Sequence, residues 1–230
     1  MPYFFDYYYI ILIIPALLFG LWAQFRVKSA YARYSKVQNI NGMTGADAAR
    51  YVLEQNGVYD ISINRIAGNL TDNYNPTNKT INLSDGVYSS TSVAAVGIAA
   101  HEAGHAVQHA VGYFPIKLRE AIIPVTQVGS TLYLPIILLG LFFNSYSTIT
   151  VGIILFASIT AFQFVTLPVE FNASNRAIEA IENGNLLYGD ELSGARSVLK
   201  AAALTYVAAL VSSMAQLLRL VLMFGGRRRD

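Results

Sequence analysis

The stretch Val125–Val169 reads VTQVGSTLYLPIILLGLFFNSYSTITVGIILFASITAFQFVTLPV and contains no charged side chain. Two apolar runs, Val125–Phe143 and Ile149–Val169, are separated by the polar residues Asn144–Thr148. Each run is long enough for a helix to cross about 30 Å of hydrocarbon. Prolines such as Pro135 and Pro168 are tolerated in or at the end of such helices. The stretch therefore predicts a transmembrane helical hairpin with a short loop.

Two further apolar segments flank this hairpin. Tyr3–Phe25 carries only Asp6, and its basic residues follow the apolar run, so it is predicted to be a retained anchor and not a cleaved signal peptide. Ala201–Phe224 either crosses the membrane or lies in its interface. That segment carries a stripe of polar residues at helical spacing, formed by Thr205, Ser212, Gln216 and Arg219.

The composition of the 230 residues agrees with a membrane protein. Hydrophobic residues make up 54% and charged residues 13%, with a formal net charge of +2 and no cysteine. Disorder requires low hydrophobicity and high charge, so it is excluded. The absence of thiols excludes a disulfide scaffold and a cysteine-ligated zinc site, and the low charge argues against a nucleic-acid binder. We expect a mostly α membrane protein with one small aqueous domain.

The basic residues predict an orientation in the membrane. Four of them follow the first apolar segment, which places that side in the cytoplasm. The N-terminus and residues 144–148 would then lie outside, while residues 28–124 and 171–200 would lie inside. The tail Arg227–Arg229 conflicts with this scheme if the last segment crosses fully. The four residues are Arg26, Lys28, Arg33 and Lys36.

The aqueous stretch between the first two apolar segments is predicted to be α+β. Thr44–Gln55 is predicted to be a helix that Thr44 caps and Asn56-Gly57 ends. Tyr59–Ile66 and Lys79–Leu83 alternate in polarity and are predicted strands. The second could be an edge strand, over Asn78–Ser84, that pairs with an extended peptide substrate. Ser90 or Ser92 is predicted to cap a helix from Val93 to about Val111.

That last helix contains His101-Glu102-Ala103-Gly104-His105, the H-E-x-x-H pattern. Residues i and i+4 of a helix lie on one face, so both imidazoles can bind one Zn²⁺. Glu102 is rotated away from them by about 100°. It can therefore act as general base toward a water whose pKa the metal lowers. The pattern predicts one catalytic zinc per chain.

A catalytic zinc needs a third protein ligand and an open position. His109 lies a further turn along the helix, about 12 Å from His101 along the axis, so it is a poor third ligand. Glu170 is the better candidate, because the predicted orientation places it on the same side of the membrane as His101 and His105. A carboxylate at a membrane boundary is costly unless it is paired or liganded. The alternative is an ion pair between Glu170 and Arg176.

Several segments together resemble the bacterial membrane-bound neutral zinc metallopeptidases. They are Met43-Thr44-Gly45, Asn75-Pro76, Val93–Gln108 (VAAVGIAAHEAGHAVQ) and Leu167–Ala177 (LPVEFNASNRA). The family is more loosely similar to heat-shock membrane proteases and CAAX prenyl proteases, in a gluzincin-like arrangement. The resemblance implies that His101, His105 and Glu170 are the zinc ligands and Glu102 the base.

The chain departs from the pattern of that wider clan in the residues around the ligands. The clan commonly has an aspartate four residues after the third ligand, which orients a ligand histidine. Here that position is Ser174, and Asn172 stands where an acidic residue is expected. Residues that bind substrate or stabilise the oxyanion do not follow from the sequence. Tyr88 and Arg176 are candidates for this role, as are Tyr206 and Arg219.

The sequence as a whole predicts five segments. They are an anchor (1–27), a zincin-like domain (28–124), a transmembrane hairpin (125–169), a helix with the third zinc ligand (170–200), and an apolar helix with a basic tail (201–230).

The predicted function is that of a multi-pass zinc endopeptidase of the bacterial inner membrane, with its site at the cytoplasmic face. Its predicted partners are the lipid bilayer and the peptides or membrane proteins that it would cleave. The alternatives are a site-2-type intramembrane protease and a catalytically idle zinc-binding scaffold.

Overall fold

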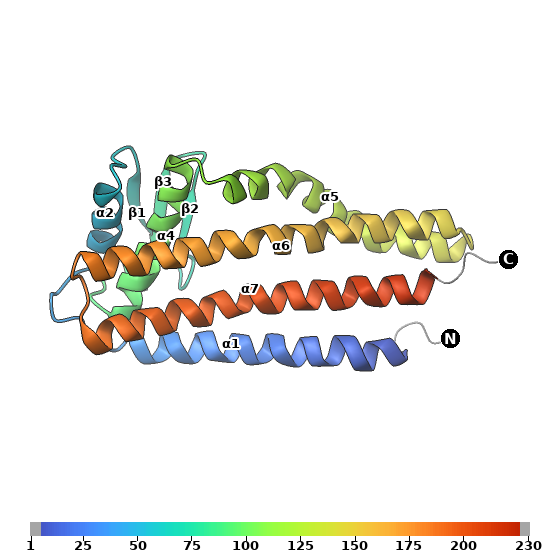
Figure 1. The fold of residues 1–230 in the computed structure, drawn as a ribbon, viewed down its shortest axis with the longest axis horizontal. Helices are drawn as coiled ribbons and strands as arrows, with labels where there is room; N and C mark the ends of the chain where they lie inside the picture. Colours follow the sequence, from blue (N-terminus) through green and yellow to red (C-terminus); the bar gives the residue numbers. More distant parts are fainter. Residues whose placement is uncertain (1–5, 226–230) are drawn as a thin grey trace. The chain divides into compact units, whose positions relative to one another are not determined.

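The computed structural model describes residues 6–225. The predicted start of the anchor at Tyr3 and the tail Arg227–Arg229 lie outside the described residues. Figure 1 labels the elements along the chain. The helices are α1 (Ile14–Tyr34, preceded by the π-helical turn η1, Tyr9–Ile13), α2 (Gly45–Gln55), α3 (Asp85–Tyr88), α4 (Val93–Ala110), α5 (Phe114–Phe142), α6 (Tyr146–Asn183) and α7 (Gly189–Phe224). The strands are β1 (Ser62–Ile66), β2 (Asn73–Asn75) and β3 (Thr80–Ser84).

The fold is mostly α, and it is that of a membrane protein, as predicted. Within residues 6–225, four helices are long and apolar enough to cross a membrane, judged by length and composition: Tyr9–Tyr34, Phe114–Phe142, Tyr146–Asn183 and Gly189–Phe224. α6 and α7 contain the segments Ile149–Val169 and Ala201–Phe224 and extend beyond them. α5 covers the segment Val125–Phe143 except for Phe143, and it begins earlier, at Phe114. The prolines do not end these helices, since Pro124 and Pro135 lie inside α5 and Pro168 lies inside α6.

The chain divides into two compact units. The apolar unit comprises Met1–Ala23, Lys117–Leu167 and Thr205–Asp230. The sheet-containing unit comprises Gln24–Ile116 and Pro168–Leu204. His101, His105 and Glu170 all belong to the sheet-containing unit.

Close helix contacts and an ion pair hold the apolar unit together. A Cβ added at Gly140 of α5 would lie 2.8 Å from the backbone nitrogen of Ile149 in α6. Such glycines let helices approach closely where no hydrophobic effect drives them together. Arg219 of the predicted polar stripe donates from Nη2 to Asp6 Oδ2 at 2.7 Å. Arg219 is therefore a structural partner of the first apolar segment.

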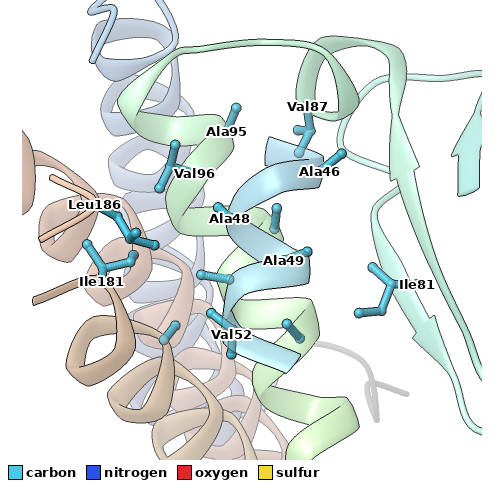
Figure 2. Close-up of a cluster of buried hydrophobic side chains, with 14 of the residues drawn as sticks. Ala46, Ala48, Ala49, Val52, Ile81, Val87, Ala95, Val96, Ile181 and Leu186 are labelled. Carbon is cyan, nitrogen blue, oxygen red and sulfur yellow. The ribbon is translucent and has the colours of Figure 1, made fainter. Parts of the chain in front are cut away.

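The sheet-containing unit is built around α2 and α4. Thr44 caps α2 in a capping box with Asp47, and Gly57 follows the helix with a φ of +68°, as the sequence predicts. Figure 2 shows the small side chains of α2 packed against α4, with Ile81 approaching from the sheet and Ile181 from α6. Alanine and valine dominate this core, so the helix backbones approach closely.

The sheet has the strand order β1-β3-β2. β3 pairs in parallel with β1 and antiparallel with β2. The predicted strands over Tyr59–Ile66 and Lys79–Leu83 are confirmed as β1 and β3. The prediction that the second is an edge strand is wrong, because β2 occupies its open side. β2 has only three residues, and they belong to a turn-rich segment, so the sequence pattern does not predict a strand there.

Candidate metal centre

The H-E-x-x-H segment lies on α4, and α6 packs against it. Ser92 caps α4 by accepting a hydrogen bond from the backbone N–H of Ala95 at 3.2 Å, which confirms one of the two predicted caps. Gly104 permits the packing, since a Cβ there would lie 2.7 Å from the carbonyl oxygen of Ala173. Ala173 is fully buried and lies three residues after Glu170. The glycine inside the segment therefore brings the two ligand-bearing helices together.

Three side chains of these helices converge on one point. Glu170 Oε2 lies 3.3 Å from His101 Nε2 and 3.5 Å from His105 Nε2. The two imidazole rings are 4.7 Å apart and nearly perpendicular, at 80°. The Glu170 side chain is 3% exposed and the imidazoles 15% and 11%. A carboxylate buried this deeply requires a cationic partner.

The spacing of these atoms fits a tetrahedral zinc ion. Zinc–ligand bonds of about 2.0–2.1 Å at tetrahedral angles place two ligand atoms about 3.3–3.4 Å apart. The two distances from Glu170 Oε2 agree with this value, and all three ligand atoms lie within 4.8 Å of one another. Two imidazole nitrogens and one carboxylate oxygen are also donors that zinc prefers. Zinc would leave a fourth position for water or substrate.

His101 and His105 each place Nδ1, the ring nitrogen that faces away from Glu170, within hydrogen-bonding distance of a neighbouring side chain. His101 Nδ1 lies 3.1 Å from the hydroxyl oxygen of Ser174, and His105 Nδ1 lies 3.0 Å from Gln108 Oε1. Metal-binding histidines commonly hold their second nitrogen in this way, which orients the ring. Ser174 occupies the position of the aspartate in the wider clan and makes the contact itself. His101 and His105 therefore each have a partner for the second ring nitrogen, and neither partner is a carboxylate.

Gln108 extends this arrangement toward α6. Its amide nitrogen donates to the carbonyl oxygen of Val169 at 2.8 Å and to Asn172 Oδ1 at 3.0 Å. Asn172 Oδ1 also accepts from Arg176 Nε at 2.8 Å. Asn172, where the resemblance leads one to expect an acid, thus reaches His105 through Gln108.

Two carboxylates, those of Glu102 and Glu170, affect the pKa of the His105 imidazole. Burial lowers the pKa of the His105 imidazole, but the hydrogen bond to Glu170 and the charges of Glu102 and Glu170 outweigh it. The pKa of His105 therefore lies above its ordinary value. Glu102 itself follows His101 on α4 and is half-buried.

The other candidate residues lie elsewhere. His109 packs its ring against Tyr74 of β2 at 5.4 Å and does not belong to the ligand cluster. Tyr88 packs against the core of α2 and α4. The alternative ion pair between Glu170 and Arg176 is not seen among the described residues, where Arg176 binds Asn172.

Sequence reasoning did not single out Gln108. The only signal was its position three residues after His105, on the same side of the helix.

A membrane protein that gathers two histidines of one helix and a glutamate of another around a common point has the make-up of a zinc peptidase. Residues 9–225 match the family described as "Putative neutral zinc metallopeptidase", and the chain belongs to that family. It is 45% identical over 216 residues to the "Putative membrane protease YugP" of Bacillus subtilis (strain 168), covering 94% of this chain and 96% of that relative. No solved structure matches the chain. The family resemblance noted in the sequence is thereby confirmed.

Proposed function

We propose that the protein is a zinc-dependent endopeptidase that cleaves peptides or membrane proteins. The observation that carries this proposal is the convergence of His101 Nε2 and His105 Nε2 on Glu170 Oε2, at 3.3 and 3.5 Å. The family described as zinc metallopeptidases and the relative named a membrane protease support the same conclusion. His101, His105 and Glu170 would hold one Zn²⁺.

Each residue has a defined part in this mechanism. Zinc, when bound, would polarise the peptide carbonyl and lower the pKa of an attacking water. Glu102 accepts the proton of that water and then delivers it to the departing amine. Ser174 and Gln108 hold the two imidazoles so that their Nε2 atoms face the metal position. Burial of the Glu170 side chain keeps bulk water away from its carboxylate.

A pair of variants tests this mechanism. Glu102→Gln removes the base and keeps the ligands, so hydrolysis of an unfolded polypeptide should fall about 10²- to 10⁴-fold with zinc content unchanged. Glu170→Ala removes a ligand, so the purified protein should lose its zinc as well. Metal content by mass spectrometry and cleavage in detergent or liposomes measure the two effects. Full activity of Glu102→Gln with zinc bound would contradict the assigned role.

The structure bears on the two alternative functions. A site-2-type protease carries H-E-x-x-H within a membrane span, but α4 is not among the four helices of the described chain that are long and apolar enough. The idle scaffold was suggested by missing acidic residues near the ligands. Ser174 and Gln108 make the expected contacts to the histidines, and a structural zinc site needs no base at position 102. Both observations favour the peptidase.

We further propose that the four apolar helices cross the bacterial inner membrane, with the metal centre on the cytoplasmic side. The support is the cluster of basic residues that follows the first apolar segment, since cytoplasmic flanks are enriched in lysine and arginine. These residues are Arg26, Lys28, Arg33 and Lys36.

A further inference from the structure

Gln108 is fully buried, and its carbonyl oxygen and both hydrogens of its amide nitrogen have partners. Its carbonyl oxygen faces His105 Nδ1, and its amide nitrogen faces Val169 O and Asn172 Oδ1. The oxygen and nitrogen of a glutamine amide are distinguished only by their partners. Partners that can only donate, or only accept, a hydrogen bond therefore determine the orientation of this amide.

Two such groups fix the orientation of the amide. The carbonyl oxygen of Val169 can only accept, so the Gln108 atom 2.8 Å away is the amide nitrogen. Arg176 Nε can only donate, so the Asn172 atom 2.8 Å away is its oxygen, which accepts from Gln108 as well. Both contacts place the amide nitrogen of Gln108 toward α6, so its carbonyl oxygen faces His105 Nδ1. Because that oxygen can only accept, Nδ1 of His105 must carry a hydrogen.

The contact of His101 is less restrictive. Its Nδ1 meets the hydroxyl of Ser174 at 3.1 Å, and a hydroxyl can donate or accept. Ser174 by itself therefore does not determine which nitrogen of His101 carries the hydrogen. Gln108 donates to two acceptors of α6, so it does determine which nitrogen of His105 carries the hydrogen.

We infer that Gln108 is a positioning residue that locks His105 with its hydrogen on Nδ1 and its Nε2 lone pair toward the metal. This inference rests on the proposed function. Both anchors of the amide flank Glu170 within two residues, so Gln108 also ties the ligand of α4 to the turn of α6 that supplies the third ligand. Asn172 and Arg176 act through Gln108 and hold its amide in place.

Nitrogen NMR of the protein loaded with ¹¹³Cd²⁺ tests the inference directly. The chain has only three histidines, and a His109→Leu variant assigns one of them. In the wild type, cadmium should couple to Nε2 of His105 while Nδ1 carries a hydrogen. Coupling of cadmium to Nδ1 of His105 would overturn the inference. This measurement needs no change at Gln108, so it holds even if a variant there folds poorly.

A second measurement uses Gln108→Met, which keeps the size of the side chain and removes its amide. Its Zn²⁺ affinity, measured by competition with a chelator, should fall about 10- to 100-fold. His109→Leu lies on the same turn outside the ligand cluster and should keep the wild-type affinity, which controls for disturbance of the helix end. Equal affinities for Gln108→Met and the wild type would overturn the inference.

These outcomes are separable from those of the proposed function. A protein that binds zinc, shows the expected coupling and loses affinity in Gln108→Met, yet cleaves no peptide, would support the inference and contradict the peptidase. A wild type that binds no zinc would contradict both.

Discussion

At the scale of single residues, His101 and His105 both have uncharged partners at their second ring nitrogen. A serine hydroxyl and a glutamine amide take the places that carboxylates commonly occupy beside such ligands. These groups orient the rings without adding negative charge, so Glu170 is the carboxylate in direct contact with both imidazoles. Removal of one neutral partner should therefore weaken metal binding without changing the charge of the site.

Ser174→Ala tests this expectation. The variant removes the oxygen 3.1 Å from His101 Nδ1, so Zn²⁺ affinity should fall about 10-fold, the lower end of the usual range for such partners. Ser197→Ala is the matched control, since Ser197 donates to Ser193 O within α7 and has no part in the centre. Titration against a fluorescent chelator measures both. Identical affinities for the two variants would show that Ser174 does not support His101.

The residues that the sequence predicted are those with distinctive chemistry. His101 and His105 follow from their spacing on a helix, and Glu170 follows from the argument about membrane sides. The structure brings these three together. The contacts of Gln108 and Asn172 could not be predicted, because amide side chains are common throughout the sequence. Only the packing of α4 on α6 shows which atoms these two amides reach.

At the scale of elements, the contact of α4 with α6 determines the spacing of the ligands. Gly104 lies between His101 and His105, and its Cα faces the backbone of Ala173. Gly97, two turns earlier on α4, faces Ala195 of α7 with more room, since a Cβ there would lie 3.4 Å from that of Ala195. The two glycines therefore differ in the space around them, which gives a matched pair of substitutions.

Gly104→Ala should separate the two helices, whereas Gly97→Ala should be tolerated. A Cβ at Gly104 would lie 2.7 Å from a backbone oxygen that cannot rotate away. Overpacking of this kind costs about 1–3 kcal/mol, and the shift would also displace Glu170 from the histidines. Thermal unfolding in detergent and zinc content measure the two effects. Wild-type zinc content in Gly104→Ala would contradict the proposed importance of this contact.

The elements show why sequence patterns predict some structure and miss the rest. The caps Thr44 and Ser92 predicted helix starts well, because their hydrogen bonds are local. The start of α5 at Phe114 was missed, since Lys117, Arg119 and Glu120 interrupt the apolar pattern while the helix continues. β2 was missed because it depends on pairing with β3, which is a contact between distant residues.

At the scale of the whole molecule, the apolar composition is accounted for by four long helices. The sequence predicted their existence from hydropathy and charge. The helix predicted over 170–200 is not one helix, because α6 continues unbroken to Asn183 and α7 begins at Gly189. The sequence missed this break, because helix ends inside polar sequence carry weaker signals. The proposed orientation rests on the basic residues after the first segment.

The absence of cysteine makes the orientation simple to test. Single cysteines at Tyr59 and Ser147, both exposed, can be introduced without removing native thiols. A membrane-impermeant maleimide should label Ser147→Cys in intact bacterial cells and Tyr59→Cys only after lysis. Zinc content of each variant serves as the control for folding. The reverse pattern of labelling would place the metal centre outside the cytoplasm.

The hydrogen bond between Gln108 and Asn172 also has an evolutionary consequence. The amide at position 108 donates to an acceptor at position 172, so a substitution at position 172 changes the surroundings of Gln108. Loss of the acceptor at position 172 would leave one N–H of the buried Gln108 amide unsatisfied, which selection removes or compensates. In an alignment of the family, these two columns should therefore vary together, although 64 positions separate them in the chain.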